Sequence, residues 1–314
     1  MRTAQEVAAV CEQLSLPFVF RAGVWKPRTR PHTFQGVGEE GLAWLEEVKR
    51  TYGVPVATEV ATPEHVAAAL QAGIDYLWIG ARTSANPIAV QAISNALTAN
   101  SLKPRAILIK NPVNADAALW IGNIERLEQT GIPVMAVHRG CNHQPCWQMA
   151  HTVRTARPDI PMLLDPSHLS GDAAQVPALM HKVTELGLDG AMIEVHYDPE
   201  HALSDAKQQI KPEELEQLVQ LEQLVQLDSL ELNWLRAEID ELDETLWETI
   251  AARMEVSRRI GEWKKAHGVA PLQPERVKVI SEKLRAKSEE LRIEEAFMLR
   301  MWELIHEESL KQQK

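Results

Sequence analysis

The sequence predicts two kinds of structure in one chain: a (β/α)8, or TIM-barrel, fold that lacks its first strand, and then an all-α domain of three helices. Two observations lead to this prediction. Over residues 18–196, short apolar runs alternate with amphipathic stretches, and strands of this kind, each followed by a helix, form parallel sheets buried on both faces. After residue 211 the pattern changes to long helices.

The apolar runs are the expected strands. They cover residues 18–23, 54–60, 76–81, 106–111, 133–140, 162–167 and 190–196. Helices are expected between them, including 62–72, 86–99 and 175–187. Thr62 and Pro63 suit the N-cap and the first turn of the first of these helices.

The expected barrel has an open seam. A closed barrel needs eight strands, whereas this chain has seven apolar runs and opens on a helix-like stretch at 3–14. The missing first strand would leave unpaired backbone on both neighbouring edges. Two alternatives stay open: another chain closes the seam, or the sequence begins inside its true reading frame.

The helical part begins with a duplication. The six residues LEQLVQ occur at 215–220 and again at 221–226, where they lengthen a predicted linking helix. Residues 230–266 contain no proline and carry apolar residues at helical spacing, which predicts one helix of about 55 Å. The apolar positions are Leu232, Leu235, Ile239, Leu242, Leu246 and Ile250. Two further helices are expected over 275–290 and 293–313.

Three helices with one very long member enclose little core, so we expect this part of the chain to dimerise. The predicted domains are a barrel over 1–212, a linking helix over 213–229 and a helical domain over 230–314.

The composition excludes several classes of protein. The chain has 314 residues and a formal charge of −11, and neither part is basic, so we expect no nucleic-acid partner. No apolar run approaches the ~20 residues that span a bilayer, and the N-terminus lacks a secretion signal. Three cysteines, Cys11, Cys141 and Cys146, cannot form a disulfide framework. We therefore expect a cytoplasmic protein that does not contact a membrane.

Charged and polar side chains follow each expected strand at the point where it ends. They are Arg21 and Lys26, Glu59, Arg82, Lys110, His138 and Arg139, Asp165 and His168, and Glu194 and His196. Because the carboxyl ends of barrel strands form the active-site face, we expect these side chains to converge.

Two groups of charged and polar side chains predict ligands. Arg82, Lys110 and Arg139 suit a phosphate or carboxylate. An imidazole with two carboxylates suits a divalent metal, and the members of that group are His168, Glu194 and Asp205. For His168 alone, a hydrogen-bonded loop histidine would be the better interpretation.

Residues 18–212 resemble the 3-deoxy-D-arabino-heptulosonate 7-phosphate (DAHP) synthase family in its shorter, microbial class. The matching stretches are FRAGVWKPRTRPHTFQGVG (20–38), TEVATPEHV (58–66), WIGARTSANP (78–87), KNPVNAD (110–116), HRG (138–140), DPSHLSG (165–171) and IEVHYDPEHALSDAKQQI (193–210). The resemblance implies condensation of phosphoenolpyruvate with erythrose 4-phosphate.

The resemblance also implies roles for individual residues. Lys26, Arg28 and Thr29 would handle erythrose 4-phosphate, with Lys26 close to the reacting centre. Phosphoenolpyruvate would be held by Arg82, Lys110 and Arg139, with Arg21 nearby. Three of the family's four ligands for a divalent metal, Mn2+ or similar, would be His168, Glu194 and Asp205.

The sequence departs from that family in two places. The fourth metal ligand is a cysteine in a Gly-Pro-Cys motif on the first strand, and neither that strand nor the motif is present. The segment CNHQPCW (141–147) is shorter than the family's loop over the active site. Cys141 and Cys146 flank His143 there, and replacement of the lost thiolate by one of them is an alternative to ordinary loop cysteines.

In the helical part, cations fall on the face that the apolar stripe predicts to be buried. The series Leu232, Ile239 and Leu246 reaches Arg253 at its next step, and Lys264 lies on almost the same face. A buried guanidinium needs an anionic partner, which is either a ligand or a Glu of another helix. Arg236 lies about 100° away on its helix, so it joins such a site only from a partner chain.

Residues 231–313 resemble the all-helical chorismate mutases, which are intertwined dimers. The matching stretches are LRAEIDELDETLWETIAARMEVSRRIGEWKK (235–265), Arg276 and IHEESLKQQ (305–313). The resemblance implies that Arg253, Lys264 and Arg276 bind chorismate, with Arg236 of the partner chain and with Ser309 and Gln313 of the last helix. It implies no cofactor. Val277 and Gln273 replace a frequent Glu and Asp.

The order of the two parts resembles a bifunctional architecture of the shikimate pathway. We expect a homodimer with two activities: DAHP synthesis, and conversion of chorismate to prephenate. Prephenate sensitivity of the synthase is a weaker hypothesis. One alternative is a chorismate mutase whose inactive synthase-like barrel acts as a scaffold or regulator. The other is a non-enzymatic protein that binds sugar phosphate or phosphoenolpyruvate.

Overall fold

The computed structural model of the protein describes residues 1–27, 32–142, 144–222 and 230–313. The chain divides into two compact units, Met1–Glu238 and Ile239–Lys314. The division falls inside helix α11 (Leu230–Ala266), so the first turns of this helix belong to the first unit. Part of the duplicated LEQLVQ segment lies outside the described residues, and the predicted domain limits stay a prediction.

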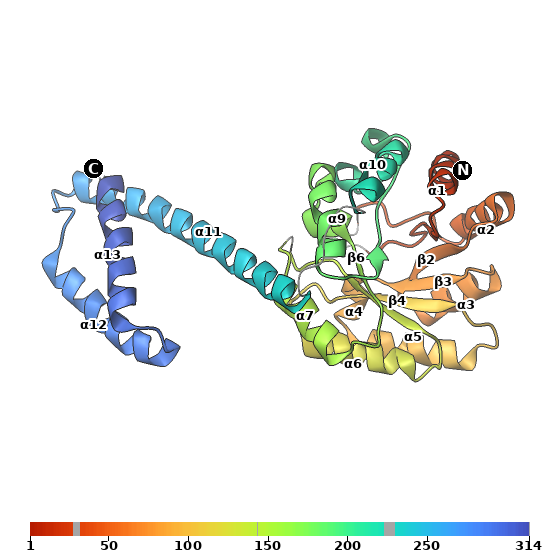
Figure 1. The fold of residues 1–314 in the computed structure, drawn as a ribbon, viewed down its shortest axis with the longest axis horizontal. Helices are drawn as coiled ribbons and strands as arrows, with labels where there is room; N and C mark the ends of the chain where they lie inside the picture. The colour runs from red at the N-terminus through yellow and green to blue at the C-terminus, as the bar shows by residue number, and fades with distance from the viewer. Residues whose placement is uncertain (28–31, 143, 223–229, 314) are drawn as a thin grey trace. The chain divides into compact units, whose positions relative to one another are not determined.

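The first unit is built on a parallel sheet of seven strands whose spatial order follows the sequence. The strands are β1 (Phe20–Arg21), β2 (Val56–Val60), β3 (Tyr76–Ile79), β4 (Ala106–Lys110), β5 (Val134–His138), β6 (Met162–Leu164) and β7 (Gly190–Ala191). Each strand lies inside one of the seven predicted apolar runs, which confirms the predicted sheet. The strands curl into a half-barrel (Figure 1).

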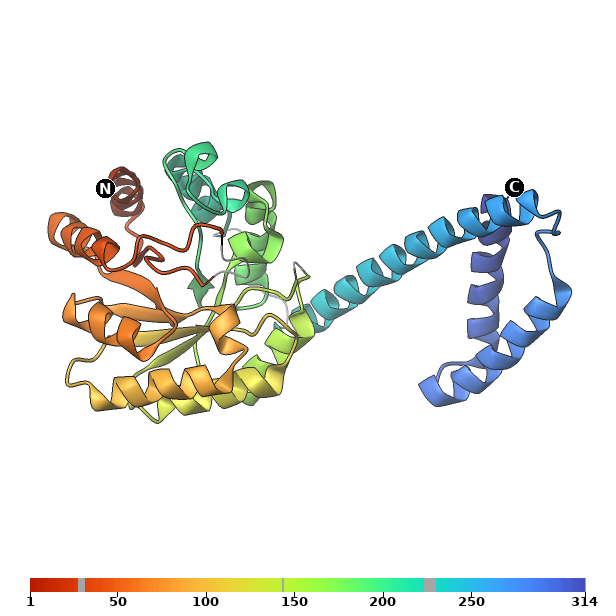
Figure 2. The same cartoon turned by 180° about the vertical axis from the view of Figure 1, so that it is seen from behind.

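Helices precede and follow the strands along the chain and surround the curled sheet, as the two opposite views show (Figures 1 and 2). They are α1 (Arg2–Gln13), α2 (Glu40–Tyr52), α3 (Pro63–Gln71), α4 (Ala81–Ser84), α5 (Pro87–Ala99), α6 (Ala117–Glu128), α7 (Trp147–Ala156), α8 (Pro166–Ser170), α9 (Val176–Glu185) and α10 (Pro212–Glu222), with short turns at Ala173–Gln175, Pro199–His201 and Ala206–Gln208. The N-cap prediction is confirmed: Thr62 accepts a hydrogen bond from the backbone N–H of His65.

The strands separate two apolar clusters because their side chains alternate between faces. On β3 and β4, the side chains of Leu77, Ile79, Ile107 and Ile109 belong to the large core under the helices. The residues between them face the inside of the curl, where a smaller cluster gathers side chains from neighbouring strands. Its members are Ala57, Trp78, Leu108, Val137 and Met192.

The outer strands of the sheet are β1 and β7. Among the described residues, no named strand pairs with the free edge of either one, which agrees with the predicted open barrel. Helix α1 packs against α10, and its Val7 lines the same cavity as Val19 and Phe20 near β1 and Ile193 beyond β7.

The first turns of α11 pack against helix α7 of the first unit. Trp234 is buried, and its ring stacks on the imidazole of His151 of α7, with centroids 5.3 Å apart. The rings of Trp147 and Trp234 pack edge to face, with centroids 6.2 Å apart. His151 Nδ1 lies 2.5 Å from Glu238 Oε1. Helix α11 is therefore continuous with the packing of α7.

The second unit contains the rest of α11, α12 (Pro274–Leu291) and α13 (Glu295–Gln312). The three predicted helices are confirmed, with α11 covering the residues predicted for it. Large apolar side chains on this helix are exposed in the single chain, including Ile239 at 58%, Leu242 at 68% and Trp247 at 63%. In the part of the chain that the structure covers, no helix has the length and apolarity to cross a membrane.

Candidate active sites

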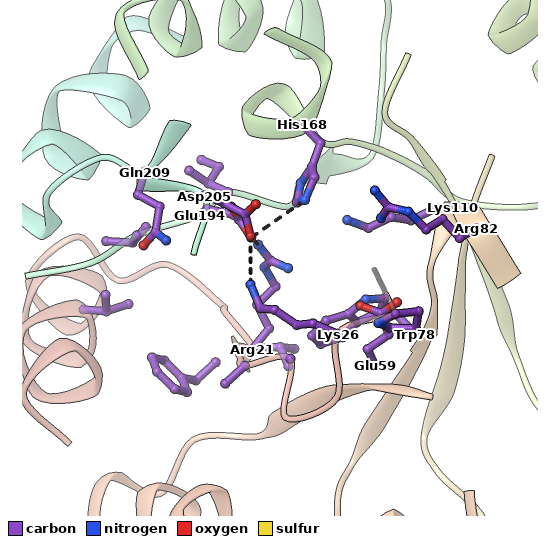
Figure 3. A pocket seen from close by; sticks show the side chains of 18 residues that line it. Arg21, Lys26, Glu59, Trp78, Arg82, Lys110, His168, Glu194, Asp205 and Gln209 are labelled. Carbon is purple, nitrogen blue, oxygen red and sulfur yellow. Dashed lines mark hydrogen bonds and ion pairs between the residues drawn. The ribbon is translucent and has the colours of Figure 1, made fainter. Parts of the chain in front are cut away.

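A cavity of about 300 Å3 lies where the strands of the first unit end. Its wall carries most of the charged side chains that the sequence places at strand ends (Figure 3). These are Arg21, Lys26, Glu59, Arg82, Lys110, His168 and Glu194, and Asp205 also lines the cavity. The topology brings them together because parallel strands with in-phase register end at the same edge.

Two carboxylates of the cavity are held by cations of the chain itself. Arg21 Nη2 donates to Glu194 Oε1 at 2.7 Å. Lys26 Nζ donates to Asp205 Oδ2 at 3.0 Å and to Ser204 Oγ at 2.6 Å. Burial alone would raise the pKa of Glu194, but Arg21 and other nearby cations lower it to about 2. Glu194 is therefore a carboxylate at any physiological pH.

The segment Asp165-Pro166-Ser167-His168 explains how His168 is positioned. Asp165 is the N-cap of α8 and accepts from the backbone N–H of His168 at 3.0 Å, and Pro166 begins the helix. The same carboxylate lies 3.0 Å from His168 Nδ1. Because a carboxylate only accepts, Nδ1 carries the hydrogen, and Nε2 is left to face the cavity, 3.9 Å from Glu194 Oε1.

The three predicted anion-binding cations lie in different surroundings. Lys110 is buried and its Nζ donates to Asp165 Oδ2 at 2.6 Å. Arg82 lines the cavity beside Lys110 (Figure 3). Arg139 is not among the residues of the cavity wall; its backbone N–H donates to Asn111 Oδ1 at 2.7 Å and its Nη2 donates to the His168 carbonyl at 3.3 Å. Burial lowers the pKa of the Arg139 guanidinium, and neighbouring Arg82 lowers it further.

Glu59 is a cavity residue for which the sequence analysis gave no role. Its side chain is half-buried near the end of β2, and loss of solvent around the carboxyl raises its pKa against the opposing effect of Lys110 and His168. Gly80 makes room for it, since a Cβ at position 80 would lie 2.1 Å from Glu59 Oε1. The available signal was its place at a strand end, which it shares with the predicted residues.

The residues do not form a ready metal site. His168 presents Nε2 in the way a metal ligand does when a carboxylate holds its other nitrogen, but Glu194 and Asp205 are paired with Arg21 and Lys26. Within the described residues, no three His, Cys, Asp or Glu side chains are arranged to hold a metal ion. The predicted metal centre therefore stays a prediction.

Four other residues that the sequence analysis named either lie outside the described residues or do not line the cavity. Arg28, Thr29 and His143 lie outside the described residues. Cys141 is buried, pairs with Gln144 through the backbone and has its Sγ 3.8 Å from Asn111 Nδ2. It does not line the cavity.

In the second unit, the predicted mutase residues of α11 and α13 meet. Arg253 Nη1 donates to Ser309 Oγ, and to the Ile305 carbonyl at 3.4 Å. Lys264 Nζ donates to Gln313 Oε1 at 3.0 Å. Gly261 permits this approach, because a Cβ there would lie 2.6 Å from the Cα of Gln313. The partners of Arg253 in the described chain are thus a hydroxyl and a carbonyl, not the glutamate considered as an alternative.

The other two predicted mutase cations are exposed. Arg276 lies in the first turn of α12, and Arg236 lies in the part of α11 that belongs to the first unit. The assignment of Arg236 to a site on a partner chain stays a prediction.

Comparison with known proteins identifies both parts of the chain. The model of the DAHP synthetase I family matches residues 1–230. The chain belongs to the DAHP synthetase I family. The model of chorismate mutase type II matches residues 235–314. This member of the DAHP synthetase I family therefore carries a chorismate mutase domain at its C-terminal end.

Individual relatives agree with this family. The chain is 32% identical over 209 residues to a phospho-2-dehydro-3-deoxyheptonate aldolase of Thermotoga maritima, an alignment that spans 64% of this chain and 60% of that protein. It is 29% identical over 228 residues to a 2-dehydro-3-deoxyphosphooctonate aldolase of a Synechococcus strain, spanning 67% and 78% of the two chains.

Solved structures give the same family and fold. A crystal structure of the Thermotoga maritima DAHP synthase matches with a TM-score of 0.61 and 29% identity, over 71% of this chain and 64% of that chain. A truncated form of 3-deoxy-D-arabino-heptulosonate 7-phosphate synthase from Thermotoga maritima has a TM-score of 0.56 at 24% identity, over 71% and 80% of the two chains, and supports the fold alone. The chain thus spans less than two thirds of the Thermotoga maritima synthase.

Proposed function

We propose that this chain is a bifunctional enzyme of the shikimate pathway. The first unit would condense phosphoenolpyruvate with erythrose 4-phosphate to give DAHP, and the helical part would rearrange chorismate to prephenate. The observation that carries the proposal is the charged cavity at the carboxyl ends of the strands in a chain whose two family matches name these two activities.

The cavity suits the proposed condensation. C3 of phosphoenolpyruvate would attack the aldehyde carbon of erythrose 4-phosphate, the aldehyde oxygen would take a proton, and water would add at C2 as phosphate leaves. Arg82 and Lys110 provide positive charge for an anionic substrate. Glu59, with a raised pKa, is suited to hold and donate a proton while Glu194 and Asp165, with lowered pKa values, stay ionised.

A divalent metal such as Mn2+ is a separate proposal. His168, Glu194 and Asp205 would be its ligands, but Arg21 and Lys26 now hold the two carboxylates. No step of the condensation is therefore assigned to a metal here. Metal content of the purified protein, measured by mass spectrometry after dialysis against Mn2+, tests the ligand set without reference to activity. Retention of one ion per chain that is lost in His168→Ala would support the set.

The helical part suits a reaction that needs no cofactor. Arg253 and Lys264 lie on one wall with Ser309 and Gln313, and cations held in this way would bind the two carboxylates of chorismate and stabilise charge that develops on its ether oxygen. We propose a homodimer that covers the exposed apolar side chains of α11 and adds Arg236 of the partner chain. A cytoplasmic location also stays a prediction.

A second candidate is a chorismate mutase with an inactive synthase-like barrel. Arg21 and Lys26 would keep Glu194 and Asp205 paired in this candidate, but the two family matches favour the bifunctional enzyme. Phosphate release from phosphoenolpyruvate plus erythrose 4-phosphate, with and without Mn2+, distinguishes the two. Turnover of both substrate pairs supports the bifunctional enzyme. Chorismate consumption without phosphate release supports the inactive barrel, and neither activity refutes both.

A further inference from the structure

Two side chains of α13 and that of its C-cap residue form a single row. His306, Ser309 and Gln313 are spaced by three and four residues, and positions with this spacing share one helix face. Two members of the row have already been placed: Ser309 contacts Arg253, and Gln313 contacts Lys264. His306 therefore faces the same side of α13 as the groups that meet the two cations of α11.

His306 has a buried nitrogen without a partner. Its Nε2 is shielded from solvent and makes no hydrogen bond within the described part of the chain. The imidazole ring stacks on Trp302, one turn earlier, with centroids 4.8 Å apart and planes 10° from parallel. A buried polar atom left unpaired destabilises the folded state, and such atoms in folded proteins call for an explanation.

The surroundings of His306 favour its uncharged form. Burial lowers its pKa, and the positive charges of Arg253 and Lys264 lower it further. An uncharged imidazole carries one N–H and one lone pair. Arg253 and Lys264 are placed to hold a dianion. An oxygen of that ligand would be an acceptor for the Nε2–H of His306.

We propose that His306 is a further ligand-binding residue of the mutase site, donating its Nε2–H to an oxygen of the dicarboxylate held by Arg253 and Lys264. The inference rests on the proposed mutase function and deepens it. An apolar side chain at position 306 would fill the space but would leave that oxygen without a donor.

The test compares three substitutions at one position. In His306→Gln the side-chain amide nitrogen reaches about as far as Nε2, in His306→Asn it reaches only as far as Nδ1, and His306→Leu removes every donor. The matched control is His267→Leu. His267 also stacks on a tryptophan four residues earlier, Trp263, with ring centroids 4.0 Å apart, but His267 is exposed. Chorismate consumption gives kcat and KM, and titration calorimetry gives prephenate affinity.

We expect His306→Leu and His306→Asn to lower kcat/KM and prephenate affinity at least tenfold, about 1.4 kcal/mol. His306→Gln should keep most of both quantities, and His267→Leu should match the wild type. Circular dichroism and gel filtration check that each variant is folded and has the wild-type assembly.

Three outcomes would overturn the proposal. Wild-type kinetics and affinity in His306→Leu would show that Nε2 meets no ligand, while the mutase function stands. Equal losses in all three His306 variants would mark the ring as a packing element. If the wild type neither converts chorismate nor binds prephenate, the mutase function fails and the proposal fails with it. If the wild type binds prephenate without turnover, the affinities of the variants decide.

Discussion

Acidification should destabilise the barrel unit through His138, which is fully buried at the end of β5. Its Nε2 lies 2.7 Å from the Pro145 carbonyl oxygen, and because a carbonyl only accepts, Nε2 carries the hydrogen. Nδ1 is buried without a partner in the described residues. The rings of Trp120 and Trp147 flank the imidazole. Protonation would therefore place a second N–H, on Nδ1, where the described residues offer no acceptor and where Arg139 is close.

Burial lowers the pKa of His138 to about 4 from an ordinary value of 6.5. Since the folded state binds the proton less tightly than the unfolded chain, the stabilising effect of the neutral ring is complete above about pH 6.5. It is lost as the pH falls towards 4. At about 1.4 kcal/mol per unit of pKa, the loss is about 2 kcal/mol at pH 5 and about 3 kcal/mol well below pH 4.

The assay compares the wild type with His138→Gln, whose amide nitrogen can still donate to the Pro145 carbonyl but does not titrate. Hydrogen exchange of peptides from β4 to β6 in increasing urea gives the free energy of unfolding of this unit alone. Between pH 7.5 and pH 5, the wild type should lose about 2 kcal/mol more than the variant. Other histidines with lowered pKa values, His65 among them, cancel in this difference. Equal losses in both proteins would refute the reasoning.

Three further predictions test single features. Gly80→Ala would place a Cβ 2.1 Å from Glu59 Oε1 and so displace the Glu59 carboxyl. Phosphate release from phosphoenolpyruvate and erythrose 4-phosphate should then fall at least tenfold, while chorismate turnover should stay unchanged. Unchanged phosphate release would contradict a role for Glu59. Arg253→Ala should abolish chorismate consumption and leave phosphate release unchanged, and loss of both in a folded dimer would exclude independent sites. Trp234→Ala removes the contacts with Trp147 and should lower the unfolding free energy of the first unit by about 3 kcal/mol in urea; unaltered stability would show that α11 is not part of its core.

The regular elements could be predicted because local sequence determines them. Helix α11 runs over the residues predicted for it, since no proline and a continuous apolar stripe leave it no place to end before Ala266. Asp165 and Pro166 specify the start of α8 in the same local way. The strands β1 and β7 are two residues long, shorter than their apolar runs, and they lie at the two ends of the strand order.

The sequence predicts that the site lies at the strand ends, but it does not predict which side chains contact one another there. Sequence alone does not give the pKa of Glu59, which depends on burial among side chains from several strands. Arg139 does not line the cavity, although Asp165 and Arg82 are close enough to affect its pKa, and its predicted role stays a prediction. The unpaired nitrogen of His306 likewise depends on where α11 and α13 meet, which no spacing along the chain specifies.

The division between the two units falls inside helix α11. Trp234 and Ala237 are buried in the core of the barrel unit, and the same helix carries Arg253 and Lys264 in the second unit. Trp234 meets Trp147, which meets His138, the residue before Arg139. A change in how the first turns of α11 pack would therefore reach the end of β5 through three rings in contact.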